Sequence, residues 1–276
     1  MAPLHTLREH WPEYLIEGWA LGCFMISAGL FATLLEYPGS PAHSALADAT
    51  LRRVLIGLAM GLTAIALIYS PWGKRSGAHM NPAVTLSFWR LGKVAGWDAF
   101  FYVVAQFAGG TLGVIAVLWL LGAAFAAPPV LLAATLPGPS GVPAAFLAEF
   151  AISLVLMGII LVASNSPRFA PYTGLAAGVL VATYISLEAP LSGMSMNPAR
   201  SFASAAPAGL WQHLWIYFAA PVLGMLCAAE LYLWLRGRGR IKCAKLQHAL
   251  DVRCIHCGYE PPPRAAAAPD AHGGVA

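Results

Sequence analysis

The chain has 276 residues, of which 59% are hydrophobic and only 10% are charged, and its formal net charge is +4. Soluble domains carry about 25% charged residues, so this composition excludes an ordinary soluble protein. The small positive charge comes without a basic-aromatic surface or a phosphate-binding loop, and we therefore expect no nucleic-acid partner.

Six long runs without Asp, Glu, Lys or Arg follow one another along the chain. A helix needs about 20 apolar residues to cross a bilayer, and each run reaches or approaches that length. The first run begins directly after Glu17 and has no clear cleavage site, which argues against a removed signal peptide. We therefore predict six transmembrane helices. The runs are residues 18–35, 54–73, 99–127, 150–167, 169–187 and 201–229.

The second run leads into the string SGAHMNPA at residues 76–83, and the fifth leads into SGMSMNPA at residues 192–199. Six of the eight positions match. Asn and Pro are unusual at membrane depth, where irregular backbone is tolerated only if it lines a cavity. The paired strings therefore predict a pore or a solute site built from two similar halves.

Each Asn-Pro-Ala begins a short helical stretch, at residues 84–90 and 200–206. Asn is a good N-cap and Pro is favoured at the first helical position. Because each half holds three spans, the second half starts on the opposite side of the membrane and the repeats are inverted. The positive N-termini of the two half-helices would then meet near the membrane centre, where Asn81 and Asn197 would donate to a solute oxygen.

Two further features recur in both halves. Glu17 stands at the start of the first span and Glu149 at the start of the fourth. The second span contains Gly57-xxx-Gly61, and the fifth contains Gly174-xxx-Gly178. Such small-xxx-small pairs let helix backbones approach closely, so we expect tight packing around the second and fifth spans.

Basic residues are strongly biased toward one side of this topology. Thirteen Lys and Arg fall on the side of the two termini, against Arg52, Arg53 and Arg200 on the other side. Positively charged loops stay in the cytoplasm, so we predict a multi-pass protein of the plasma or inner membrane with both termini cytoplasmic.

A tail follows the sixth span. Residues 236–260 are basic at first and then carry a Cys/His pattern, and residues 261–276 have the composition of a disordered segment. Three thiols and one imidazole can close a tetrahedral zinc site, although one CxxC is only half of a strong signature, and an unliganded tail is the alternative. A folded knuckle beneath the pore would contact Lys74 and Arg75 at the inner mouth, or a neighbouring subunit. The candidate ligands are Cys243, His248, Cys254 and Cys257.

The strings SGAHMNPAVT and SGMSMNPARS, the two glutamates, Gln106 and Pro221 make the chain resemble the major intrinsic protein family of aquaporins and aquaglyceroporins. The resemblance implies an all-α membrane channel with six transmembrane helices and two re-entrant half-helices. The channel domain would span residues 12–235 after a cytoplasmic N-terminus at 1–11, with repeat one at 12–122 and repeat two at 143–235. It also implies a homotetramer in membrane lipid, with one pore per subunit for water or small neutral solutes and no required cofactor.

The resemblance assigns roles to individual residues. Two triplets would form the central constriction: Asn81, Pro82 and Ala83, and Asn197, Pro198 and Ala199. Arg200 would form an outer selectivity filter with Ile185, Met194 and Met60. The spacing of the glycine pairs gives the first half one extra residue ahead of its string, which we place within residues 72–75, and Gly61 would replace Met60 if that residue lies elsewhere. Glu17 and Glu149 would hold the re-entrant loops by accepting backbone N–H bonds, and His79 would line the cytoplasmic vestibule.

The filter departs from the water-channel pattern of the family. Ile185 stands where water channels usually carry His, and Met60 stands where an aromatic residue is usual, whereas Ser201 replaces the Asp of glycerol channels. We therefore predict a channel for water and small neutral solutes, with a glycerol or small-solute facilitator of little water selectivity as the alternative. An ion-coupled transporter or an adhesion scaffold is the alternative of another class. The sequence shows no catalytic constellation, so an enzyme is not expected.

Overall fold

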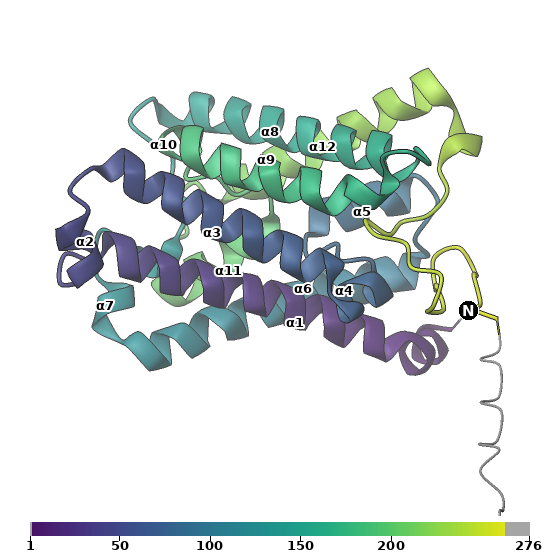
Figure 1. Cartoon of the computed structure of the whole chain (residues 1–276), viewed down its shortest axis with the longest axis horizontal. Helices are drawn as coiled ribbons and strands as arrows, with labels where there is room; N and C mark the ends of the chain where they lie inside the picture. The colour runs from purple at the N-terminus through teal and green to yellow at the C-terminus, as the bar shows by residue number, and fades with distance from the viewer. Residues whose placement is uncertain (1, 263–276) are drawn as a thin grey trace, which may run out of the picture.

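The computed structural model describes residues 2–262, which form helices with short connections up to residue 240 and a non-helical segment after it (Figure 1). Six helices within this range are long and apolar enough to cross a membrane. They are α1 (Pro3–Glu36), α3 (Ala49–Tyr69), α6 (Gly96–Leu121), α8 (Gly141–Ser164), α9 (Thr173–Leu187, which follows the 3₁₀ turn η2 at Ala170–Tyr172) and α12 (Leu214–Arg236). The predicted fold class and the six spans are thus confirmed.

Two short helices begin inside the bundle at the repeated strings. They are α5 (Pro82–Arg90) and α11 (Pro198–Ala208), and each has Asn at its N-cap and Pro in its first turn. Short helices lead into them: α4 (Pro71–Ser76) before the first and α10 (Ala189–Ser192) before the second. The remaining elements are the connections α2 (Pro41–Ala45), α7 (Ala123–Ala126) and η1 (Leu131–Ala133), and the turn η3 (Arg238–Arg240) after the last span.

Helix pairing shows how the two halves interlock. In the first half α1 packs along α6, and in the second half α8 packs along α12. Across the boundary between the two halves, α3 packs along α9. Each half-helix packs on a span of the other half, α5 on α12 and α11 on α6. This exchange places the two Asn-capped helix starts inside the bundle, facing one another.

Repeat-related glycines make the α3–α9 contact close. A Cβ placed on Gly61 would lie 2.6 Å from the carbonyl oxygen of Gly178, and one placed on Gly57 would lie 2.6 Å from that of Ala182. Contacts this short mean that even a methyl group at either position would force the two helices to shift apart. The small-xxx-small pattern of the sequence therefore marks the seam between the two halves.

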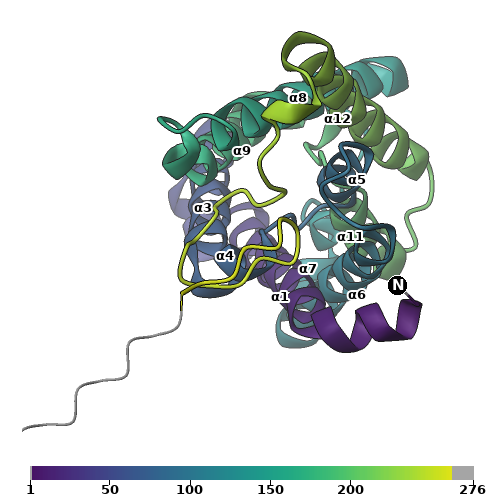
Figure 2. The ribbon, with the colours of Figure 1, turned by 90° about the vertical axis from the view of Figure 1, so that its right-hand side faces the viewer.

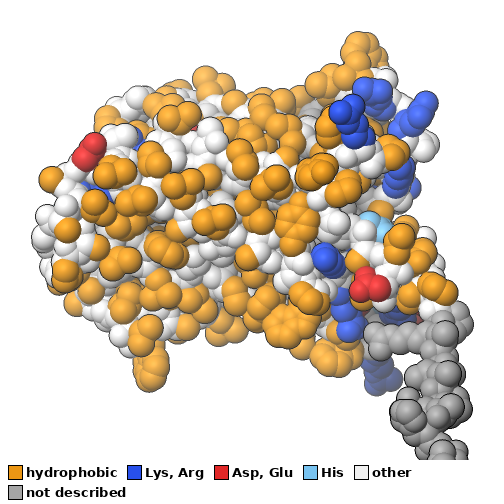
Figure 3. Space-filling model, in the orientation of Figure 1, with side chains coloured by type: hydrophobic (Ala, Val, Ile, Leu, Met, Phe, Trp, Pro, Cys, Tyr) orange, Lys and Arg blue, Asp and Glu red, His pale blue; other side chains and the backbone are white. Residues whose placement is uncertain are grey.

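The outer surface has the character of a lipid-facing protein. Large apolar side chains cover its flank, whereas charged side chains gather at the two ends (Figure 3). Trp119 and Trp234 are 87% and 81% exposed, which would be costly in water. The N-terminus and the tail lie at the same end of the bundle (Figure 1), as an even number of spans requires.

Residues 237–262 fold back across that end of the bundle (Figure 2). We call this end of the bundle the tail end, and we call residues 237–262 the tail. The sequence predicted disorder for 261–276, and nearly all of that range, 263–276, lies outside the described residues.

Candidate functional site

Glu17 is fully buried in α1 and its carboxylate organises the first re-entrant loop. Oε1 accepts hydrogen bonds from Ser76 Oγ at 2.7 Å and from the His79 backbone N–H at 3.0 Å. Oε2 accepts from the Met80 backbone N–H at 2.6 Å and from Gln106 Nε2 at 2.9 Å. Such bonds satisfy backbone groups that cannot reach water.

Glu149 does the same for the second loop. Its Oε1 accepts from Ser192 Oγ and from the Ser195 backbone N–H, both at 2.7 Å, and its Oε2 accepts from the Met196 backbone N–H at 2.7 Å. The loop has the same backbone shape in both halves, because Ala78, Met80, Met194 and Met196 all have φ between +50° and +55°. Non-glycine residues in this region are strained by about 1–3 kcal/mol, and the carboxylate bonds hold the strained loops in place.

One tyrosine completes each loop, and this role of the two tyrosines was not identified from the sequence. Tyr102 on α6 donates its hydroxyl to the Ser76 carbonyl at 2.7 Å, and Tyr217 on α12 donates to the Ser192 carbonyl at 2.6 Å. Both rings are fully buried. The sequence does contain a sign of this role, because the two tyrosines are separated by almost the same number of residues as the two Asn-Pro-Ala strings.

The two asparagines connect the loops of opposite halves. Asn81 Oδ1 accepts from the Ala83 N–H at 2.8 Å, and its Nδ2 donates to the Met196 carbonyl at 2.7 Å. Asn197 Oδ1 accepts from Ala199 N–H at 3.0 Å, and its Nδ2 donates to the Met80 carbonyl at 2.7 Å. Each amide nitrogen carries two hydrogens, so one remains for a solute. Pro82, Ala83, Pro198 and Ala199 are buried in the first turns behind them.

A cavity of about 660 Å³ runs past these asparagines. The residues proposed for the filter, Met60, Ile185, Met194 and Arg200, all line it, as does His79. Gly61, the alternative to Met60, packs instead against Gly178. The cavity walls are mostly apolar, with polar groups at the re-entrant loops and at Arg200, and with Glu36 and Arg53 contributed by α1 and α3.

Arg200 supplies a cation to this cavity. Its backbone N–H is bound by Asn197 Oδ1 at 3.2 Å, and its Nη1 is buried without a hydrogen-bond partner among residues 2–262. An unpaired buried donor is costly unless a solute or water satisfies it. Ser201, the next residue, bonds to Ser195 Oγ and Thr135 Oγ1, each at 2.6 Å, and so supports the loop.

The four tail residues predicted as metal ligands do come together. Their ligand atoms all lie within 4.8 Å of one another, with 3.5 Å between the Cys243 and Cys254 sulfurs and 3.3 Å between His248 Nε2 and Cys257 Sγ. A hydrogen bond from the Cys243 thiol stabilises the Cys254 thiolate and lowers the pKa of Cys254 below its ordinary value. A thiolate is the form that binds metal, so this cluster of Cys243, His248, Cys254 and Cys257 could hold a metal ion.

Comparison with known proteins agrees with this geometry. The sequence profile of the family described as "Major intrinsic protein" matches residues 9–232. The chain is 40% identical over 190 residues to a "Probable aquaporin AqpM" of Archaeoglobus fulgidus, covering 65% of this chain and 75% of that protein. It is 36% identical over 178 residues to a "Putative aquaporin NIP4-1" of Arabidopsis thaliana, covering 64% of this chain and 60% of that protein.

The fold is also similar to that of a solved structure, the "aquaglyceroporin from Plasmodium falciparum". The TM-score is 0.65 at 20% sequence identity, and the match covers 81% of this chain and 95% of that one. At this identity the likeness concerns the fold.

Proposed function

Because this chain belongs to the major intrinsic protein family, whose members are membrane channels and not enzymes, we propose that it is a passive pore for water and small neutral solutes. The single observation that carries the proposal is the cavity that passes both inverted Asn-Pro-Ala loops and the Arg200 guanidinium, whose Nη1 has no hydrogen-bond partner within residues 2–262. Donors fixed around a narrow passage replace the hydration of a neutral solute, while a fixed cation repels cations.

We further propose that the filter admits solutes larger than water. Ile185, Met60 and Met194 offer apolar walls beside Arg200. Met side chains are flexible, and an apolar wall does not stabilise a strict file of hydrogen-bonded waters. The relatives named as aquaporins support a water pore, and the composition of this filter favours a small neutral solute in addition.

The arrangement of the chain in the membrane belongs to the same proposal. We place the tail end in the cytoplasm of a cell membrane, because most Lys and Arg lie in the loops at that end. Residues 12–235 would form the channel and 236–260 a distinct cytoplasmic segment. We also propose a homotetramer, in which each subunit keeps a complete pore, because the cavity lies within one chain.

Ion-coupled transport is disfavoured by the state of the buried carboxylates. Glu17 and Glu149 already accept four and three hydrogen bonds from their loops and neighbouring side chains. A carboxylate that couples an ion must exchange partners, and exchange here would release the re-entrant loops.

Stopped-flow light scattering on proteoliposomes tests the pore. We expect water permeability above that of empty vesicles, together with measurable uptake of glycerol or urea. The variant Asn81→Leu/Asn197→Leu, which removes both amides from the constriction, should lose most of the flux. Vesicles with correctly folded wild-type protein that are no more permeable than empty ones would contradict the proposal, and water flux without any solute uptake would contradict the permissive filter.

For the tail cluster we propose zinc as the metal. Tetrahedral zinc with bonds of about 2.3 Å to sulfur and about 2.0 Å to nitrogen has ligand–ligand edges of about 3.5–3.8 Å, close to the two observed contacts. Three thiolates and one imidazole are a donor set typical of structural zinc. Elemental analysis of protein purified without a metal-affinity tag should find about one zinc per chain. A Cys254→Ser/Cys257→Ser variant should lose it.

A further inference from the structure

The first half of the tail is buried although it follows the last span. Ala244 and Lys245 are 0% and 1% exposed, and Leu246 is 4% exposed. Burial of a lysine is unusual, because its ammonium loses hydration. The Lys245 ammonium keeps one contact, to the Arg253 carbonyl at 3.4 Å. This segment is therefore packed into the bundle and does not lie loosely on it.

The segment packs against the first re-entrant loop. The Leu246 N–H donates to the Gly77 carbonyl at 3.1 Å, and His79 Nε2 donates to the Ala244 carbonyl at 2.7 Å. A side chain on Gly77 would meet Lys245 at 3.2 Å, so the glycine leaves room for the tail. The sequence predicted contact with Lys74 and Arg75 or with a neighbouring subunit, whereas these contacts fall on Gly77 and His79, a few residues further along the chain.

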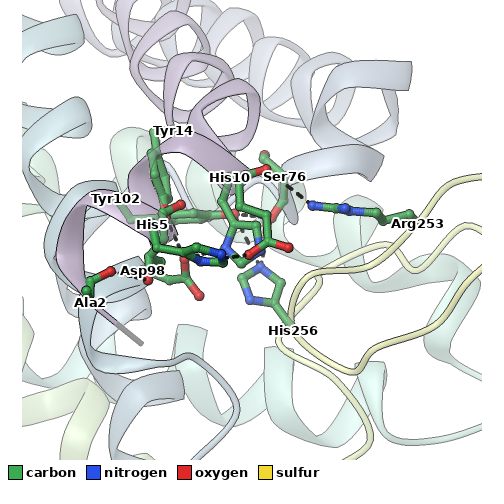
Figure 4. A network of polar contacts seen from close by, with 11 residues as sticks. Ala2, His5, His10, Tyr14, Ser76, Asp98, Tyr102, Arg253 and His256 are labelled. Carbon is green, nitrogen blue, oxygen red and sulfur yellow. Dashed lines mark hydrogen bonds and ion pairs between the residues drawn. The ribbon is translucent and has the colours of Figure 1, made fainter.

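A second contact lies beside the first. The His256 ring stacks on the His79 ring with 5.7 Å between centroids, and its Nε2 donates to the Ser76 carbonyl at 3.0 Å. Figure 4 shows His256 reaching from the tail toward Ser76 and Tyr102, with Arg253 extended toward α1. His256 is thus used for docking, which leaves His248 as the nitrogen of the metal cluster.

These contacts place the tail in the pore. Leu246 lines the same cavity as the asparagines and His79. Among the residues that line it, Leu246 is the one contributed by the tail, and its N–H is bound to the Gly77 carbonyl of the first re-entrant loop. The tail-end mouth is therefore bounded partly by a side chain that belongs to no membrane span.

The metal cluster closes a loop around this docked segment. Cys243 comes directly before Ala244–Leu246, and His248 follows shortly after it. Cys254 and Cys257 flank His256, so both docking contacts lie next to ligands. Ordering a residue costs about 1–2 kcal/mol of conformational entropy, and small metal sites are commonly unfolded without metal. Metal binding and docking should therefore be coupled.

We propose that zinc bound by Cys243, His248, Cys254 and Cys257 holds the segment 243–247 in the tail-end mouth and thereby restricts flux through the pore. This inference rests on the proposed channel function. Loss of the metal frees Leu246 and the His256 contact, and the mouth widens. The protein would thus conduct more when zinc is scarce.

The test compares zinc-loaded and zinc-stripped full-length protein in proteoliposomes. Stripping with EDTA before reconstitution should raise water or solute permeability about fivefold or more, the lower range of typical coupling between two sites. Added zinc should reverse the increase. The Cys254→Ser/Cys257→Ser variant should be open and insensitive to zinc, whereas Cys227→Ser, which removes an exposed thiol from α12, should behave as wild type.

Leu246→Ala separates restriction from metal binding. It should bind zinc as wild type does but conduct more, because the side chain in the mouth is shortened. Zinc-dependent protection of 241–247 from hydrogen exchange provides a readout that does not depend on flux. Zinc below about 0.2 per chain, or zinc that changes neither flux nor exchange, would overturn the inference. A different outcome is possible: the protein conducts neither with nor without zinc, while zinc still protects residues 241–247 from hydrogen exchange. That result would refute the channel proposal and the restriction of flux, and it would leave only the metal-dependent docking of the tail.

Discussion

Ile185 lines the same cavity as Arg200, and its apolar side chain offers no hydrogen-bonding group to a solute. Replacing it with His should add a polar wall and reduce the passage of glycerol relative to water. We expect the ratio to fall about tenfold, the scale of changing one contact in a selective pocket. Ile185→Leu is the matched control and should keep the wild-type ratio. Equal ratios in all three proteins would show that this residue does not set selectivity.

Glu188, one turn after Ile185, is a buried carboxyl whose two oxygens have no hydrogen-bond partner among the described residues. Burial, with a contribution from the negative charge of Glu149, raises the pKa of Glu188 from 4.5 to about 7. A pKa raised by folding favours the folded protein below about pH 4.5, and that advantage is lost as the pH rises through about 7.

We therefore expect the melting temperature of the protein to fall between about pH 5 and pH 8 partly because of this one group. Glu188→Gln, which cannot ionise, should flatten that decline. Thermal unfolding in detergent at several pH values measures it. An identical decline in wild type and variant would show that Glu188 does not titrate in this window.

At the level of helices, the sequence predicted most of what the structure contains. Uncharged runs marked the spans, and Asn followed by Pro marked the start of each half-helix, because local capping and bilayer solvation act on short stretches of chain. The pairing of Tyr102 with Ser76 was not predicted, because it joins residues of different helices. The docking of residues 243–247 into the pore was not predicted either, since no periodicity distinguishes a docked loop from a free one.

The seam between α3 and α9 offers a test at this scale. Gly61→Ala places a methyl group 2.6 Å from the Gly178 oxygen and should destabilise the protein by roughly 1–3 kcal/mol. Gly158 of α8 has open space where its side chain would be. Gly158→Ala should therefore be neutral or stabilising, because alanine favours a helix over glycine. Melting temperatures in the reverse order would contradict the close seam.

For the whole molecule, the inverted repeat brings the positive ends of α5 and α11 together at Asn81 and Asn197. Two such ends facing a central solute should repel protons and orient a water so that it cannot pass a proton onward. We expect proteoliposomes with a pH-sensitive dye to show no proton current above empty vesicles under an imposed potential. A large proton current that needs intact protein would contradict this role of the paired helices.

The link between α12 and the docked segment is short, and this affects how the pore would respond to zinc. Cys243 follows Arg236, the last residue of α12, closely, and Lys242 is fixed to Asn165 by a hydrogen bond of 2.7 Å. A segment tethered this closely meets its own mouth at an effective concentration on the order of millimolar or higher. Each pore is therefore served by its own chain. The response to metal should be graded and non-cooperative across an assembly, and it should not change with the density of protein in the membrane.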